Sequence, residues 1–194
     1  MIVKVCGITN REDALAAVEA GAGALGFNFY PKSPRYITPA DAATISAGVP
    51  AGVLRVGVFV NEPRVAEIVA KAGLDIAQLH GDEIEAPAGL RVWKAFRVND
   101  RFRMEDVEVF PAEAFLLDTP TELYGGSGQT FDWSRARGAS RRILLAGGLD
   151  ADNVGTAIRI AQPWGVDACS RLESSPGRKD HSRMARFIAA ALAA

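Results

Sequence analysis

The stretch IVKVCGITNREDALAAVEAGAGALGFNF, residues 2–29, has the pattern of a strand, a helix and a second strand. The runs 2–7 and 24–29 are short, apolar and rich in β-branched or aromatic residues, as buried strands are. Between them, residues 11–22 repeat apolar side chains every three or four positions and then reach a glycine, which is typical of a helix and its end. Apolar strands covered by helices indicate a parallel sheet, so this stretch predicts a β-α-β unit.

The same rhythm continues along the rest of the chain. Strand-like runs are expected at 2–7, 24–29, 55–60, 76–81, 91–96, 114–119, 142–148 and 164–170. Eight β-then-α units close into a barrel, whereas an open doubly wound sheet would need more length for this many strands. The helices expected before residue 91 and over 132–138 are short. We therefore predict an α/β protein that is a compact, parallel, eight-stranded (β/α)₈ TIM barrel, with one domain over residues 1–194.

Composition limits the classes of partner. Of the 194 residues, 48% are hydrophobic and the formal net charge is −1. Such a chain can bury a sizeable core, and its balanced charge gives no electrostatic reason to bind nucleic acid or a membrane. The sequence shows no secretory leader and no run of about 18 apolar residues. We expect a cytoplasmic protein with a small-molecule partner, as a monomer or a homodimer.

Two strand ends carry titratable side chains, and in a barrel the loops after the strands form the active-site face. Cys6 ends the first strand, where a thiolate can act as a base if positive groups lower its pKa; plain packing is the alternative. Asp118 ends the sixth strand after an apolar run, where burial raises a carboxyl pKa and suits it to proton donation; capping the next turn is the alternative. A second titratable group at another strand end favours catalysis.

The loops after the seventh and eighth strands have features of a phosphate site. Gly147 and Gly148 come directly before an expected helix with Asp150 as its N-cap, and glycine backbone lets N–H groups approach an anion. Ser170 and Arg171 add a hydroxyl and a guanidinium after the eighth strand. Barrels frequently bind phosphate with these two loops, although a glycine pair alone more often marks a turn.

Further polar side chains are candidates on the same face. Arg35 lies in a loop stiffened by Pro31 and Pro34, which suits its guanidinium to a bidentate grip on a carboxylate; an ordinary solvated arginine is the alternative. Gln78 and His80 lie two apart on one strand and hence on one face. The chain has two histidines without clustered acidic partners, so we expect no metal site.

Strand alternation also predicts neighbours for the cysteines. Lys4 shares a strand face with Cys6, and Asp167 shares one with Cys169. If Cys6 points into the barrel, Lys4 does too, as a buried cation that favours the thiolate or pairs with a carboxylate. The first and eighth strands are neighbours in a closed barrel, so oxidation could join the two cysteines and silence a base. A Cα separation above about 7 Å would exclude such a disulfide.

A set of longer motifs runs in order along the chain. They are KVCGIT (4–9), GFNFYPKSPRYI (26–37), VGVFVN (56–61), QLHG (78–81), LLDT (116–119), YGGSGQTFDW (124–133), LAGGLDADNV (145–154), GVD (165–167) and PGRKD (176–180). Together they resemble the phosphoribosylanthranilate isomerases of tryptophan biosynthesis. The resemblance implies a (β/α)₈ barrel that converts N-(5′-phosphoribosyl)anthranilate to 1-(2-carboxyphenylamino)-1-deoxyribulose 5-phosphate by an Amadori rearrangement, without cofactor or metal.

The resemblance also implies roles for individual residues. Cys6 falls on the general base that removes the proton from sugar C2′, and Asp118 on the general acid that protonates the ring oxygen. Arg35 falls on the arginine that binds the anthranilate carboxylate. Gly147 and Gly148 fall on the glycines that hold phosphate. We expect the substrate site to be completed by Asp167, Ser170, Arg171 and His80.

One loop departs from the family pattern. Residues 167–173 read DACSRLE, where the family usually reads DVSSGVE, so Cys169 replaces a serine and Arg171 a glycine. If that glycine supplied a positive φ, Arg171 carries about 1–3 kcal/mol of strain or the loop has moved. Phosphate binding through this backbone is then altered, although the charge of Arg171 could compensate.

Two other functions fit parts of the pattern. A barrel similar to aminoimidazole carboxamide ribonucleotide isomerase would be expected to use two carboxylates and two phosphate sites. The cysteine at the first strand and the one recognisable phosphate site argue against it. A non-catalytic phosphometabolite-binding barrel would keep the glycine pair and need neither Cys6 nor Asp118.

Overall fold

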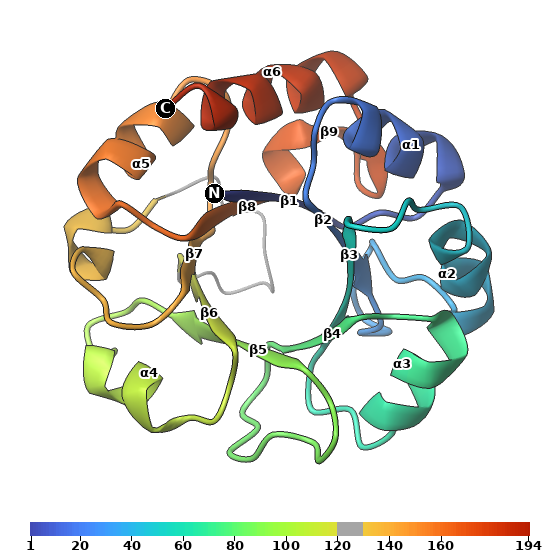
Figure 1. Cartoon of the computed structure of the whole chain (residues 1–194), viewed down its shortest axis with the longest axis horizontal. Helices are drawn as coiled ribbons and strands as arrows, with labels where there is room; N and C mark the ends of the chain where they lie inside the picture. Colours follow the sequence, from blue (N-terminus) through green and yellow to red (C-terminus); the bar gives the residue numbers. More distant parts are fainter. Residues whose placement is uncertain (120–129) are drawn as a thin grey trace.

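In the computed structural model, which describes residues 1–119 and 130–194, eight parallel strands form a closed barrel in the order of the sequence (Figure 1). The strands are β1 (Ile2–Cys6), β2 (Ala24–Asn28), β3 (Leu54–Phe59), β4 (Ile76–Leu79), β5 (Val92–Arg97), β6 (Ala114–Asp118), β7 (Ile143–Leu145) and β8 (Gly165–Ala168). Each overlaps one of the expected runs. The predicted (β/α)₈ barrel is therefore confirmed.

Helices surround the barrel, but their layer is incomplete. The α-helices are α1 (Arg11–Glu19), α2 (Pro39–Ser46), α3 (Val65–Ala72), α4 (Met104–Val109), α5 (Val154–Ala161) and α6 (His181–Leu192). The short helix expected before residue 91 does not form, because Pro87 and Gly89 interrupt that connection. In the described part of the connection from β6 to β7, the helix is one 3₁₀ turn, η1 (Trp133–Ala136).

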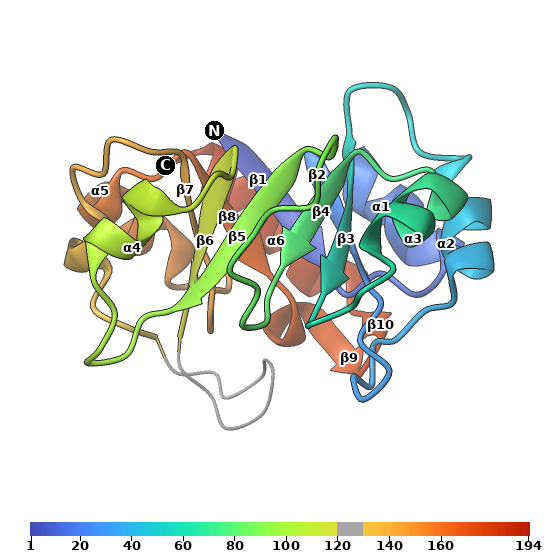
Figure 2. The ribbon, with the colours of Figure 1, turned by 90° about the horizontal axis from the view of Figure 1, so that it is seen from below.

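A second short 3₁₀ helix and a hairpin follow β8. These are η2 (Ser170–Leu172), β9 (Glu173–Ser175) and β10 (Arg178–Lys179). Their two- and three-residue strands are too short to produce a hydrophobic period, so the sequence did not predict them. Figure 2 shows the arrowheads of β3, β4 and β5 pointing to the edge of the barrel where this hairpin lies. The hairpin therefore stands beside the active-site end of the barrel.

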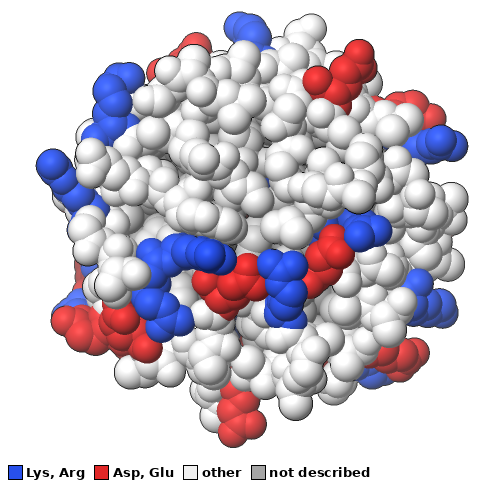
Figure 3. Space-filling view, viewed as in Figure 1, with Lys and Arg blue, Asp and Glu red and all other residues white. Residues whose placement is uncertain are grey.

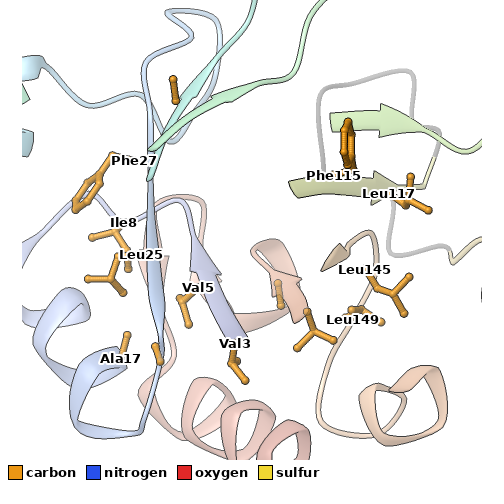
Figure 4. Packing of buried hydrophobic residues seen from close by; sticks show 14 of the residues in the cluster. Val3, Val5, Ile8, Ala17, Leu25, Phe27, Phe115, Leu117, Leu145 and Leu149 are labelled. Carbon is orange, nitrogen blue, oxygen red and sulfur yellow. The ribbon is translucent and has the colours of Figure 1, made fainter. Parts of the chain in front are cut away.

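Each strand serves two apolar layers, because successive side chains point to opposite faces. Val3, Val5, Leu25 and Phe27 belong to the layer between the strands and the helices (Figure 4). The other faces fill the barrel interior with Ala24, Val56, Ile76, Trp93, Ala95, Ala114, Leu116, Leu144 and Ala146. Near the carboxyl ends of the strands, the inward positions carry polar side chains instead, and these line a pocket.

The amino-terminal ends of the strands carry solvated ion pairs. Arg55 pairs with Asp75 at 2.8 Å, and Glu113 pairs with Arg91 at 2.8 Å and with Arg142 at 3.4 Å. Figure 3 shows a row of alternating basic and acidic side chains across one face of the molecule. The pairs made by the exposed Arg91 and Arg142 contribute about 1 kcal/mol or less each. Among the described residues, no helix is long and apolar enough to cross a bilayer.

Candidate active site

A pocket of about 590 Å³, including its open mouth, lies at the carboxyl end of the barrel. Its lining includes these predicted residues: Cys6, Arg35, His80, Asp118, Asp167 and Ser170. An adjoining pocket shares Asp118, Asp167 and Ser170 and adds Gly147, Gly148 and Arg171. The structure thus brings together every residue that the sequence named as a site candidate.

Cys6 ends β1 with its thiol in the pocket, above a fully buried lysine. A hydrogen bond from Cys169 lowers the pKa of Cys6 to about 6; burial opposes this shift, and the positive charge of Lys4 adds to it. A thiol with such a pKa is mostly thiolate at neutral pH, which is the form that can accept a proton. Gly26 on β2 leaves room for this arrangement, since a Cβ there would lie 2.8 Å from Cys6 Sγ and 3.0 Å from Lys4 Nζ.

Lys4 is held in the barrel interior by Asp167 of β8. Its Nζ donates a hydrogen bond to Asp167 Oδ1 at 2.7 Å. Burial alone would lower the pKa of Lys4, but the attraction of Asp167 and of the Cys6 sulfur raises it above its usual value. Lys4 therefore stays charged beneath the thiol. The prediction that Lys4 points inward with Cys6 is confirmed, and the cation both pairs with a carboxylate and favours the thiolate.

Replacing Lys4 with Met should lower the free energy of unfolding by about 3–5 kcal/mol, because Asp167 would be left as an unpaired buried charge. Urea denaturation followed by circular dichroism measures this loss. Arg91→Met is the matched control: it breaks a pair with an exposed arginine and should cost about 1 kcal/mol or less. Equal costs for the two variants would contradict a structural role for the buried pair.

Asp118 ends β6 on the inner face of the barrel. Burial, followed by the negative charges of Asp167 and Cys6, raises the pKa of Asp118 to about 7, although the Thr119 N–H and Arg97 oppose the shift. A large share of Asp118 is therefore protonated near neutral pH and can donate a proton.

His80 follows β4, and its Nε2 lies 3.5 Å from Asp118 Oδ2. Burial and the positive charges of Arg97, Lys4 and Lys94 lower the pKa of His80 to about 4. The imidazole is therefore neutral at physiological pH. Its side chain is a polar neighbour of Asp118 in the pocket lining. Because it is neutral, it adds no positive charge that would stabilise the Asp118 carboxylate.

Arg35 is nearly buried and already grips a carboxylate of the chain itself. Its Nε and Nη2 donate to the two oxygens of Glu173 at 2.8 and 2.7 Å. The bidentate geometry expected for Arg35 is thus present, with Glu173 of β9 as the partner. A ligand carboxylate would have to use the Arg35 N–H groups that do not donate to Glu173. Sequence reasoning missed Glu173 because 138 positions separate it from Arg35.

Gly147 and Gly148 both adopt left-handed backbone, with φ of +83° and +67°. A Cβ on Gly147 would collide with Thr119, so only glycine fits at this point. The helix does not follow directly, however, and the prediction of Asp150 as its N-cap is wrong. Asp150 accepts hydrogen bonds from the Asp152 and Asn153 N–H groups in a turn, and α5 begins after Asn153.

Arg171 shows no left-handed backbone. It lies in η2, and the described non-glycine residues with positive φ are Asn61 and Gln162. The strain considered for Arg171 is absent, because the loop forms a right-handed 3₁₀ turn that any residue can adopt. The side chain is about half exposed, and its Nη1 lies 3.8 Å from Asp150 Oδ2. A guanidinium therefore stands next to the glycine pair.

The structure places Gln78, which the sequence named beside His80, and adds Lys179, which the sequence did not single out. Gln78 lines the pocket, and its Oε1 is buried without a hydrogen-bond partner among the described residues. It can accept a hydrogen bond from a ligand, and its shared face with His80 was the available signal. Lys179 is buried beside Glu173 at 3.1 Å. The motif at 124–133 lies mostly outside the described residues.

The two cysteines are neighbours and both are free thiols. Val5 pairs with Ala168, so Cys6 and Cys169 each follow the last paired residue of β1 and β8. Adjacent strands lie roughly 5 Å apart, which is inside the range that a disulfide can span. Within residues 1–119 and 130–194, no group of three His, Cys, Asp or Glu side chains could hold a metal ion.

Comparison with known proteins agrees with this geometry. The sequence model of "N-(5'phosphoribosyl)anthranilate (PRA) isomerase" matches residues 3–190. A protein of Solibacter usitatus named N-(5'-phosphoribosyl)anthranilate isomerase is 58% identical, over 100% of this chain and 98% of its own length. The crystal structure of phosphoribosyl anthranilate isomerase from Thermotoga maritima, an enzyme described as dimeric, superposes with a TM-score of 0.88 at 44% identity and covers 100% of both chains.

A further crystal structure of a phosphoribosyl anthranilate isomerase contains a ligand. It is a complex with reduced 1-(o-carboxyphenylamino)-1-deoxyribulose 5-phosphate, and it superposes with a TM-score of 0.83 at 41% identity over 100% of both chains. The family model matches nearly the whole chain, and a relative shares more than half of its residues. The chain belongs to the N-(5'-phosphoribosyl)anthranilate isomerase family.

Proposed function

We propose that Cys6 and Asp118 carry out the family's isomerisation in this chain as general base and general acid. The reaction converts N-(5′-phosphoribosyl)anthranilate to 1-(2-carboxyphenylamino)-1-deoxyribulose 5-phosphate in tryptophan biosynthesis. The observation that supports these roles is one pocket in which a thiol has a pKa lowered to about 6 and a carboxyl has a pKa raised to about 7. Opposite shifts in two facing groups are typical of an acid and base pair.

The proposed steps need one proton removed from carbon and one given to oxygen. Protonated Asp118 donates to the furanose ring oxygen as its bond to C1′ breaks, which leaves a protonated Schiff base with the anthranilate nitrogen. The Cys6 thiolate then removes the proton from C2′, and the electron pair forms the enolamine. Protonation at C1′ and loss of the hydroxyl proton at C2′ give the ketone. No redox cofactor is needed, since the oxidation at C2′ balances the reduction at C1′.

The remaining pocket residues fit the two ends of this substrate. Gly147, Gly148, Ser170 and Arg171 surround the adjoining pocket with backbone N–H groups, a hydroxyl and a guanidinium, which suit a phosphate. Arg35 lies in the main pocket, where its remaining N–H groups suit the anthranilate carboxylate. The compound bound in the solved relative carries both of these groups.

Asp167 and His80 complete the proposed substrate site. Asp167 positions Lys4 under Cys6, and neutral His80 stands beside Asp118. For the whole protein, we propose a cytoplasmic enzyme whose partner is this phosphoribosyl compound, with neither nucleic acid nor membrane as a partner. It acts as a monomer or a homodimer, and light scattering coupled to size exclusion distinguishes the two.

The test is an assay with phosphoribosylanthranilate generated in situ, followed by the loss of its anthranilate fluorescence. We expect turnover without added metal or cofactor, and unchanged turnover after treatment with a chelator. A barrel that only binds phosphometabolites would bind the reduced product and leave the fluorescence constant. Turnover of an aminoimidazole carboxamide ribonucleotide in place of this substrate would assign the chain to the alternative isomerase.

A further inference from the structure

Cys169 is a second thiol in the pocket, and the proposed steps leave it without a role. It follows β8 where Cys6 ends β1, and both side chains line the same pocket. Adjacent strands lie roughly 5 Å apart, so the two thiols are neighbours, and their mutual interaction lowers the pKa of Cys6 and raises that of Cys169. Two thiols in contact can hold two, one or no protons, and the charges around them decide which state the folded protein favours.

A cluster of three charged side chains surrounds Cys169. Lys179 of β10 donates from Nζ to the Cys169 carbonyl at 3.2 Å, and the same Nζ lies 3.8 Å from Cys169 Sγ. Glu173 of β9 accepts from Lys179 at 3.1 Å and from Arg35 at 2.8 and 2.7 Å. One carboxylate thus faces two buried or nearly buried cations. Among these three side chains, the positive charges outnumber the negative charge by one. The next carboxylate, Asp13 of α1, accepts from the Lys179 backbone N–H at 2.8 Å and has His181 as its own partner at 2.8 Å.

The charges around Cys6 cancel each other. Lys4 of β1 and Asp167 of β8 form a buried pair at 2.7 Å. Asp118 of β6 carries no charge while it is protonated, and His80 is neutral because its pKa is about 4. The surplus positive charge near Cys169 is therefore uncompensated until one thiol ionises. A single thiolate balances the pocket, whereas a second would be an unpaired buried anion.

The remaining proton lies on Cys169 because its other acceptor is already occupied. In the structure the Cys169 thiol donates a long hydrogen bond to Glu173 Oε1, with 3.8 Å between Sγ and the oxygen. That oxygen has closer donors in Arg35 Nε at 2.8 Å, Lys179 Nζ at 3.1 Å and the Gly177 N–H at 3.3 Å. A carboxylate oxygen with three nearer donors is a poor acceptor for a fourth. The sulfur of Cys6 is the better acceptor, since an anionic sulfur gains most from a donor.

We propose that Cys169 is a positioning residue that donates its S–H to the Cys6 thiolate, so that the two thiols hold one proton between them. Arg35 and Lys179 supply the positive charge that compensates the resulting anion. The inference rests on the proposed role of Cys6 as the base, and it explains how that base stays ionised in a buried site. The shared hydrogen bond accordingly lowers the pKa of Cys6 and raises that of Cys169.

The test measures ionisation of Cys6 without turnover. Iodoacetamide alkylation of Cys6 is followed by mass spectrometry across pH, with a phosphine present to keep both thiols reduced. In Cys169→Ala, we expect the midpoint of the alkylation profile to rise by about one pH unit or more, so alkylation near the wild-type midpoint slows up to about tenfold. Cys169→Ser keeps a hydroxyl donor and should restore most of the shift.

A wild-type midpoint in Cys169→Ala would overturn the proposal, as would an Ala and a Ser variant that shift equally. Lys179→Met should also raise the midpoint, because it removes the surplus charge; Lys71→Met, on the exposed surface of α3, is the matched control and should not. Alkylation requires no substrate. Failure to isomerise phosphoribosylanthranilate would contradict the proposed function. The alkylation profile would still show whether Cys169 lowers the pKa of Cys6.

Discussion

Cys6→Ala should lower kcat/KM by about 10²- to 10⁴-fold, which is the range that a general base contributes. Alanine has no group that can accept the C2′ proton. In the wild type, the base must be deprotonated. We therefore expect kcat/KM to fall as pH drops below about 6, the pKa of Cys6. Steady-state loss of anthranilate fluorescence across pH measures both effects.

Cys6→Ser is the matched control for size, because a hydroxyl fits the same space and does not ionise in this pH range. It should be nearly as inactive as the alanine variant. Both variants should bind the reduced product with close to wild-type affinity, which isothermal calorimetry can measure. Wild-type turnover in either variant would show that another group removes the proton.

Asp118→Asn should also lower kcat/KM by about 10²- to 10⁴-fold, since an amide cannot protonate the ring oxygen. The acid must be protonated to act. In the wild type we therefore expect kcat/KM to fall above about pH 7, the pKa of Asp118. Because kcat/KM also falls below about pH 6, its dependence on pH should be a narrow bell centred between pH 6 and 7. The two apparent pKa values of this bell belong to the coupled pair of groups.

The stability of the Asn variant shows whether lost activity reflects lost folding. Burial raises the pKa of Asp118 from 3.8 to about 7, so the folded state binds this proton more tightly than the unfolded state does. Between these values, wild-type stability falls as pH rises. Asparagine does not ionise, so Asp118→Asn avoids the loss of stability that comes from ionising a buried carboxyl. The variant should be at least as stable as wild type at pH 8 in thermal melts. A folded Asp118→Asn variant with wild-type turnover would contradict the acid role.

Much of the barrel was predictable because its strands carry local signals. Apolar runs and the helices between them can be recognised from the local sequence alone. The carboxyl ends of the strands then meet at one face of a barrel. Cys6 and Asp118 could be singled out for that reason. Glu173 could not, because its contact with Arg35 depends on a hairpin with strands of two and three residues. The start of α5 was misplaced because a turn at Asp150 satisfies the same N–H groups as a helix cap.

The seam between β1 and β8 has a consequence for the newly made protein. Lys4 and Asp167 meet across 163 positions of sequence, and Cys169 reaches Cys6 across the same seam. A chain still emerging from the ribosome, or one truncated before β8, holds Cys6 and Lys4 without Asp167 and Cys169. Such a fragment is expected to be catalytically inactive. Turnover therefore reports that synthesis has finished and that the first and last strands have met.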